Sequence, residues 1–283
     1  MTIVAVWREA DALWCVADTR ISRPMEKGSV NVTTDAGGKL FPLRITCRKE
    51  AFFQHGVLFM NRPHHDQKVG VAFAGNVTAA TQTITTMVLV CQELHTEKDD
   101  QIPALCDVAF LLSRVSAQYA AHVRSATLDL STRNLFSFVI FGFCPVAQEL
   151  QAWMIEEEVK DEQTTVSVKR CSTSSETDVI VLGSQQARFR ELLTEFRSNG
   201  RDEFDRSTRW PKLVVEKMVL ESRGDVGGSV SIGLATKDGF ENRWTSAPDV
   251  PGQPRGRRLL NGIDVDEIIG RIGPARVGGF GQA

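Results

Sequence analysis

The sequence lacks a strong net charge and any long apolar run, and these two absences exclude two kinds of partner. Its 283 residues carry 33 Lys and Arg against 35 Asp and Glu, which leaves a formal charge of −2. A general nucleic-acid binder would carry a clear basic excess, and the short basic cluster at 255–258 does not supply one. The longest apolar stretches, such as 136–144, fall far short of the roughly 20 residues that a membrane-spanning helix needs. We therefore expect neither nucleic acid nor a membrane as a partner.

Short cysteine spacings are also missing. The six cysteines contain no CxxC pair, and several lie inside apolar runs, where a free thiol behaves as a small hydrophobic group. This usage is typical of a reducing compartment. Arg8, Glu9 and Asp11 interrupt the first apolar run before the core of a secretory signal could form. We expect a cytoplasmic protein.

Cofactor motifs are absent as well. No glycine-rich phosphate-binding motif occurs, so we expect no nucleotide site. His64, His65 and Asp66 are residues of the kind that bind metals, but no third partner stands at metal-ligand spacing. We interpret them as a solvated loop, and we expect no cofactor and no metal.

What the sequence does contain is a pair of short apolar runs at its start. Thr2 opens a run at 2–6, and after a polar turn a second run at 12–17 ends on Asp18-Thr19-Arg20. Short apolar runs rich in β-branched residues predict buried strands, and the tight polar link between them predicts a hairpin. The hydroxyl of Thr2 is then expected at the start of a sheet.

The rest of the chain shows strand and helix patterns in groups. Apolar residues three and four positions apart predict two pairs of helices, at about 77–95 and 103–122, and at 186–198 and 211–222. Strands are predicted before, between and after these pairs, at 39–43, 69–75, 135–144, 150–155, 166–169, 179–182, 227–235 and 240–244. This order predicts an α+β protein, a four-layer αββα sandwich of two antiparallel sheets flanked by helix pairs.

The domain organisation follows from shifts in composition. Residues 1–246 fit one domain, and 46–68 look like an insertion into it. From 247 to 283 proline and glycine become frequent, which predicts a flexible C-terminal tail.

Six short motifs occur in a set order over about residues 2–245. They are Thr2, Asp18-Thr19-Arg20, Lys39 at the head of a strand, Ala74-Gly75 before a helix, Gly183-Ser184 and Gly227-Gly228-Ser229. In this order they resemble the motifs of the proteasome β-type subunits, which are N-terminal-nucleophile (Ntn) hydrolases, and of their bacterial relatives. The similarity is closest to bacterial proteasome homologues in which the threonine follows the initiator methionine without a propeptide. The resemblance implies the Ntn-hydrolase fold and a threonine-type endopeptidase.

The resemblance also implies roles for single residues. Thr2 would be the nucleophile once Met1 is removed, because its free α-amine can then accept the hydroxyl proton. Lys39 would lower the pKa of these two groups by its charge, and Asp18 would keep Lys39 charged and oriented.

Further roles are implied for residues around this centre. The N–H of Gly75 would stabilise the oxyanion, and Ser184 would bond to the amine or to a water molecule. The family also has an aspartate and a serine shortly before its Gly-Gly pair. Here Arg223 and Val226 occupy those positions, and Asp225 is displaced by two residues.

A substrate pocket is the last implied feature. Ile21, Gly37, Phe73 and Val77 would line the pocket for the residue that precedes the cleaved bond. Because these residues are apolar, we expect cleavage after hydrophobic residues.

The resulting hypothesis is a peptidase that cuts peptides or unfolded proteins inside a ring or double ring of its own copies. An ATP-dependent unfoldase partner is compatible with it, although no residue identifies one. Two alternatives stay open, a hydrolase that uses the same Thr2 chemistry on a small amide and a non-catalytic scaffold subunit, which Arg223 and Val226 favour. Taken singly, each motif also has a plainer interpretation: Thr2 as the first residue of a strand, or Gly183-Ser184 as a helix N-cap.

Overall fold

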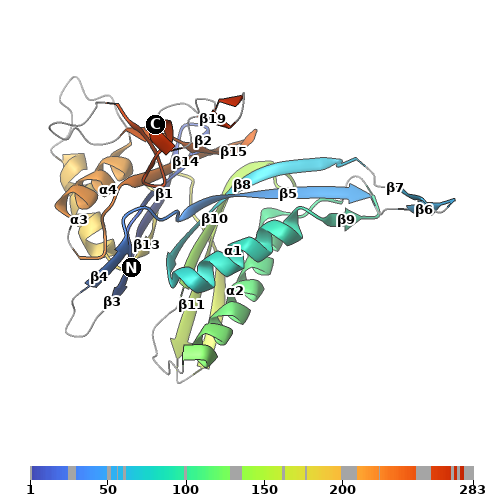
Figure 1. Ribbon diagram of the computed structural model, residues 1–283, viewed down its shortest axis with the longest axis horizontal. Helices are drawn as coiled ribbons and strands as arrows, with labels where there is room; N and C mark the ends of the chain where they lie inside the picture. Colours follow the sequence, from blue (N-terminus) through green and yellow to red (C-terminus); the bar gives the residue numbers. More distant parts are fainter. Residues whose placement is uncertain are drawn as a thin grey trace.

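The computed structural model (Figure 1) shows how these segments are arranged. It describes residues 2–24, 30–49, 52–55, 57–59, 62–98, 101–127, 136–160, 163–175, 177–198, 209–222, 224–246, 256–268, 271–272 and 275–276.

The N-terminal hairpin lies inside a five-stranded antiparallel sheet. Val4 pairs with Ala17 and Glu9 with Ala12, so the predicted hairpin is confirmed. Its two strands are neighbours of further strands on both sides and are almost entirely buried, which explains why they are continuous apolar runs. The order is β13 (Val179–Gly183), β1 (Ile3–Glu9), β2 (Ala12–Asp18), β14 (Val230–Thr236) and β15 (Gly239–Arg243).

A second large sheet has six strands. Their order is β12 (Gln163–Cys171), β11 (Glu149–Lys160), β10 (Phe136–Cys144), β8 (His65–Gly75), β5 (Leu40–Lys49) and β9 (Leu94–Thr96). The pairs are antiparallel except β5–β9, which is parallel. Because β5 and β8 are antiparallel, the start of β5 lies beside the end of β8. Lys39, just before β5, and Gly75, at the end of β8, are therefore at the same end of these two strands.

Two pairs of helices cover the two large sheets (Figure 1). The helices α1 (Val77–Cys91) and α2 (Leu105–Thr127) pack on the six-stranded sheet, and α3 (Gln186–Ser198) and α4 (Trp210–Glu221) on the five-stranded sheet. The predicted apolar face of α1 is confirmed, because Ala80, Ile84, Met87 and Cys91 are all buried. The side chain of Asn76 begins this helix by accepting a hydrogen bond from the Ala79 N–H at 3.0 Å.

Apolar side chains form three clusters. One lies between the six-stranded sheet and α1 and α2, and another between the five-stranded sheet and α3 and α4. The third joins the two large sheets and contains Val4, Cys15, Ala72 and Val139. The two large sheets are therefore held face to face by a shared apolar layer.

The expectation of a four-layer αββα sandwich with only two antiparallel sheets is nevertheless wrong. The described residues lie more in strands than in helices, and the six-stranded sheet curls as a half-barrel over α1 and α2 (Figure 1). The described residues also form four smaller sheets. They are β3 (Ile21–Pro24) with β4 (Val30–Thr34), β6 (Phe52–Gln54) with β7 (Val57–Phe59), β16 (Thr245–Ser246) with β17 (Arg258–Leu260) and β18 (Ile263–Asp264), and β19 (Arg271–Ile272) with β20 (Ala275–Arg276). These strands are two to five residues long, which is too short for a repeating apolar pattern to mark them in the sequence.

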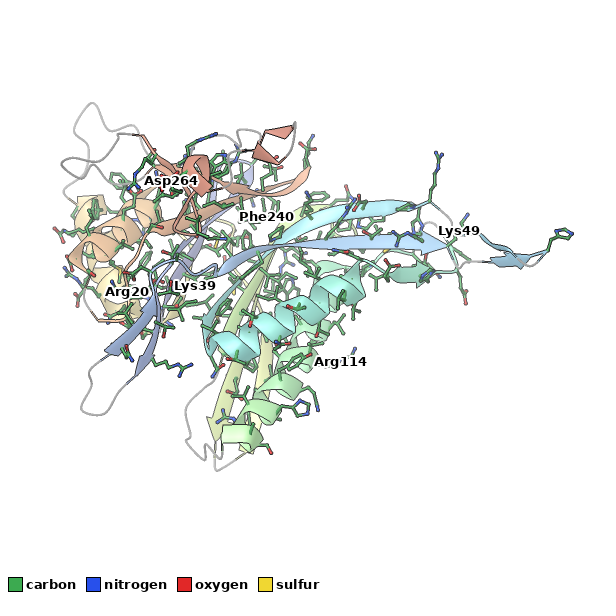
Figure 2. The ribbon with its side chains drawn as sticks, in the orientation of Figure 1. Arg20, Lys39, Lys49, Arg114, Phe240 and Asp264 are labelled. Atoms are coloured by element: carbon green, nitrogen blue, oxygen red, sulfur yellow. The ribbon has the colours of Figure 1, made fainter. Side chains whose placement is uncertain are left out.

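The predicted insertion at 46–68 contains the end of β5, the β6–β7 hairpin and the start of β8. It lies at the Lys49 end of β5, whereas Lys39 precedes the other end (Figure 2). In the predicted tail, the described residues include β17, β18 and the short helix α5 (Val265–Ile268). The assignment of 1–246 to a single domain stays a prediction. In the described part of the chain, no helix has the length and apolar character required to span a bilayer.

Candidate active site

Ends of strands from both large sheets meet at Asp18 and Lys39. Asp18 is the last residue of β2, and Lys39 directly precedes β5. The Lys39 Nζ donates a hydrogen bond to Asp18 Oδ1 at 2.7 Å, and the two side chains are 1% and 0% exposed. The structure thus brings together two predicted site residues that are 21 positions apart in sequence.

The Asp18 carboxylate accepts three further hydrogen bonds, all from backbone N–H groups. Its Oδ1 accepts from Ile3 at 3.0 Å, and its Oδ2 accepts from Arg20 and from Gly227 at 3.3 Å each. A buried carboxylate is costly unless it is paired and fully hydrogen-bonded. Here it is both, and it ties β1 and the Gly227 segment to Lys39.

Burial shifts the protonation equilibria of this pair. It lowers the pKa of Lys39, against the opposing effects of the Asp18 charge and hydrogen bond and of the Asp225 charge. Burial likewise raises the pKa of Asp18, and Lys39 opposes this shift. The pKa of Lys39 is thus lower than that of an exposed lysine, while the hydrogen bond to Asp18 opposes the loss of its charge.

Thr2 immediately precedes the Ile3 N–H that binds Asp18. It is buried, with 3% of its surface exposed, and its carbonyl oxygen accepts a hydrogen bond from the Ser184 N–H at 3.2 Å. The backbone of Gly183 has φ +106°, and a Cβ there would lie 1.7 Å from the Thr2 carbonyl oxygen. Only glycine fits at that position. The predicted glycine–serine pair thus reaches Thr2 through its backbone.

The side chain of Ser184 turns to Asp225. Ser184 Oγ and Gln185 Nε2 donate hydrogen bonds to the two oxygens of the Asp225 carboxylate, the second at 3.1 Å. Asp225 is 2% exposed, and its charge acts to raise the pKa of Lys39. Asp225 therefore belongs to the same buried group, in spite of its displacement in the sequence.

The two residues that depart from the family pattern have different positions. Arg223 lies outside the described residues. Val226 is buried in the apolar cluster beneath α3 and α4, and its carbonyl oxygen accepts a hydrogen bond from Arg20. Val226 thus makes an apolar contact at the position where the family pattern has a serine.

Sequence reasoning missed the role of Asp35. Its carboxylate forms a bidentate pair with Arg20, at 2.7 Å to Nε and 3.2 Å to Nη2, and its carbonyl oxygen accepts from the Thr19 hydroxyl at 2.6 Å. Thr19 Oγ1 in turn accepts from the Ser229 N–H at 2.7 Å. The available signal was an acidic residue in the polar segment that leads into Gly37-Gly38-Lys39.

The predicted pocket residues are only partly brought together. Ile21 lies against Gly37, where a Cβ would be 2.3 Å from Ile21 Cδ1. The Phe73 N–H donates a hydrogen bond to the Lys39 carbonyl oxygen at 3.2 Å. Its side chain, however, is fully buried in the apolar cluster with α1 and α2, and its ring is 6.2 Å from that of Phe41. Val77 packs on the same cluster. Ile21 and Gly37 are thus the predicted lining residues that share one surface.

Gly75, the predicted oxyanion donor, ends β8 just before the N-cap of α1. It has φ +120° and pairs with Phe136 of β10. The residue is exposed, so its backbone is open to an approaching group.

The histidine pair does not form a metal site with its neighbours. His65 and Asp66 lie in β8 and not in a solvated loop, so that interpretation is wrong for these two residues. Asp66 is bound to Arg44. Among the residues that the structure describes, no group of three or more His, Cys, Asp or Glu side chains could hold a metal ion.

Two solved structures share this fold. One is Anbu (ancestral beta-subunit) from Yersinia bercovieri, with a TM-score of 0.50 and 13% identity over 85% of this chain and 86% of that one. The other is the helical assembly of the Anbu complex from Pseudomonas aeruginosa, with a TM-score of 0.52 and 13% identity over 86% and 85%. No family model and no curated protein matches the sequence.

These comparisons correct the family inferred from the motifs. The resemblance pointed to the proteasome β-subunit family itself, whereas the structural neighbours are Anbu proteins, which are proteasome-like but distinct. At 13% identity the likeness concerns the fold alone. In this chain each of the six short motifs stands at or next to the end of a strand.

Proposed function

We propose that the chain is an N-terminal threonine hydrolase that cleaves peptide bonds, with Thr2 as its nucleophile. The observation that carries the proposal is the buried Asp18–Lys39 pair, with the Ile3 N–H on the same carboxylate oxygen. Thr2 directly precedes Ile3, whose N–H shares Asp18 Oδ1 with the buried Lys39 ammonium, which supports a role for this ion pair beside the Thr2 hydroxyl. Structural use alone explains this poorly, because a buried ion pair is weak evidence for stability.

The proposed reaction needs Met1 to be removed. The free α-amine of Thr2 then takes the proton of Oγ1, and Oγ1 attacks the substrate carbonyl carbon. The Gly75 N–H stabilises the oxyanion that forms. When the C–N bond breaks, the amine leaving group takes the proton from the Thr2 ammonium. Water then hydrolyses the ester on Thr2 by the same route.

The buried group supports each step electrostatically. The Lys39 ammonium favours the neutral form of the nearby amine and the developing alkoxide of Thr2. Asp18 and Asp225 hold that ammonium in place, and the contacts of Ser184 and Gln185 fix Asp225. The scaffold alternative was based on Arg223 and Val226. The hydrogen bonds that Asp225 accepts support catalysis over that alternative.

The assembly and the substrate extend the proposal. One structural neighbour is a helical assembly of the Anbu complex, and we propose that this chain likewise assembles with its own copies, in the cytoplasm. Ile21 beside Gly37 offers an apolar surface, so peptides with hydrophobic residues before the cleaved bond are the proposed substrates. A small amide is the second candidate, because the Thr2 chemistry does not depend on the length of the substrate.

Covalent labelling tests the nucleophile. A threonine-directed epoxyketone or boronate should add one molecule per chain to the wild type and none to Thr2→Ala, as measured by intact mass. The same spectrum should show the loss of Met1. Thr19→Ser, which keeps a hydroxyl at a different buried threonine, is the control and should label as the wild type does. A retained Met1, or equal labelling of Thr2→Ala, would show that Thr2 is not the nucleophile.

A further inference from the structure

A two-residue turn in the C-terminal segment contacts the loop that leads to Lys39. The turn consists of Asn261 and Gly262 and joins β17 to β18, whose residues Leu260 and Ile263 form a pair. Both turn residues have positive φ, 52° and 82°. This is the backbone that a two-residue hairpin requires and that Asn-Gly adopts readily.

The turn packs on residues 35–38. A Cβ on Gly262 would lie 2.9 Å from the Ala36 Cα and 2.9 Å from the Asp35 carbonyl oxygen, so the two backbones touch. A Cβ on Gly38 would lie 3.1 Å from the Asn261 Nδ2. The Asn261 side chain therefore lies directly against the residue before Lys39.

The turn is itself anchored to the five-stranded sheet. Ser231 Oγ donates a hydrogen bond to Asn261 Oδ1 at 2.8 Å, and Ser231 pairs with Ala17, the residue before Asp18. At the base of the hairpin, Leu259 and Val265 are buried. Asn261 thus links the strand beside Asp18 to the loop before Lys39.

The loop at 36–38 is held by backbone contacts, one of which is the hydrogen bond from the Ala36 N–H to Thr34 Oγ1 at 3.1 Å. Its sequence is Ala-Gly-Gly, which has large conformational freedom before folding, and the Gly37 N–H is bonded to the Thr19 carbonyl oxygen at 2.8 Å. A small displacement there would move Lys39 relative to Asp18. Misplacements of about 1 Å at a reacting centre can cost a hundredfold in rate.

We propose that the Asn261-Gly262 turn is a positioning element that holds the loop at 36–38 and thereby sets the place of Lys39. Its effect on turnover rests on the proposed function, whereas its hold on the loop does not. Asn261 is a positioning residue, since it acts through Gly38.

The test compares Asn261→Gly with the wild-type chain. Glycine keeps the turn but removes the side chain that contacts Ser231 and Gly38. The amides of residues 36–38 should exchange with deuterium about tenfold faster. Turnover should show kcat reduced about tenfold with KM changed less than about twofold, because Lys39 acts on the transition state.

A pH profile separates positioning from a general loss of structure. Asp18, Asp225 and Arg20 are the charged groups that act on Lys39. Burial keeps the pKa of Lys39 below the ordinary 10.5. Activity should therefore fall as the pH rises through this lowered pKa. In Asn261→Gly, Lys39 should be less buried and its pKa should be higher, so the fall in activity should occur at a higher pH. Asn261→Asp, which keeps the acceptor for Ser231, should restore the wild-type exchange at residues 36–38.

Two further variants complete the design. Ser231→Ala removes the same hydrogen bond from the other side, so its effect should not add to that of Asn261→Gly. Gln148→Gly is the matched control, because it replaces another side chain at positive φ, 54°, in the turn between β10 and β11. It should leave loop exchange and kinetics as in the wild type.

Each outcome decides. Unchanged exchange at 36–38 in Asn261→Gly would overturn the inference, and faster exchange with unchanged kcat and pH profile would overturn the positioning role. If the wild type shows no Thr2-dependent turnover, the proposed function fails, while the exchange result still establishes or refutes the hold on the loop.

Discussion

Lys39 directly precedes β5 and Arg44 lies within it, but their ion pairs with Asp18 and Asp66 differ in surroundings. The first is at most 1% exposed, and its carboxylate accepts three additional backbone hydrogen bonds. In the second, Arg44 and Asp66 are 52% and 40% exposed. Exposed pairs contribute little to stability, and buried pairs cost desolvation that is recovered only when every contact is made. This difference is what the proposed role of the buried pair in catalysis predicts.

The largest effect should come from removing the buried cation. Lys39→Met keeps the length of the side chain but leaves Asp18 as an unpaired buried carboxylate, so it should lower the free energy of unfolding by about 3–5 kcal/mol. Denaturant titration measures this. Arg44→Met, the matched change at the exposed pair, should leave the unfolding midpoint nearly unchanged.

The double variant Lys39→Met/Asp18→Asn sharpens this comparison. It removes both buried charges and keeps an acceptor for the Ile3 N–H, so it should recover part of the lost stability without recovering turnover. If Lys39→Met and Arg44→Met destabilised the chain equally, burial would not be the source of the difference.

The two regions also differ in what the sequence could predict. The apolar runs of β1 and β2 and the spaced apolar residues of α1 predicted buried elements, because burial on a repeating face leaves a regular pattern. Asp18 and Lys39 could be chosen because each stands at the end of such an element. No pattern marks Asp35, whose partners Thr19 and Arg20 depend on tertiary contacts.

The C-terminal segment teaches the complementary lesson. Its proline and glycine content predicted flexibility, yet Asn261-Gly262 between Leu260 and Ile263 is a strong local hairpin signal, and the hairpin forms. Composition averages over a segment and hides such a signal. Asp225 shows another limit of sequence-based prediction. It is displaced by two residues from the position that the family pattern gives, yet its carboxylate accepts a hydrogen bond from Ser184.

A smaller effect should separate two glycines that both have a positive φ. Gly183 and Gly239 have φ +106° and +123°, but a Cβ on Gly183 would lie 1.7 Å from the Thr2 carbonyl oxygen, whereas at Gly239 the nearest atom would be 3.5 Å away. Gly239→Ala should therefore cost only the backbone strain, about 1–3 kcal/mol. Gly183→Ala should cost clearly more and also abolish the labelling of Thr2, since it displaces that residue. Equal losses of stability in the two variants would show that the close approach to Thr2 does not matter.

The smallest effect concerns the exposed pair and its dependence on pH. The Arg44 hydrogen bond lowers the pKa of Asp66, so the pair stabilises the folded chain above the ordinary pKa of an aspartate, and this contribution is lost as the pH falls through the lowered value. Asp66→Asn should thus lower the thermal midpoint slightly at about pH 7, and the difference from the wild type should vanish at about pH 2. Asp238→Asn, at an exposed turn where the carboxylate has no such partner in the described contacts, is the control and should show no such convergence. A midpoint difference for Asp66→Asn that stayed constant with pH would mean that packing, and not the ion pair, accounts for it.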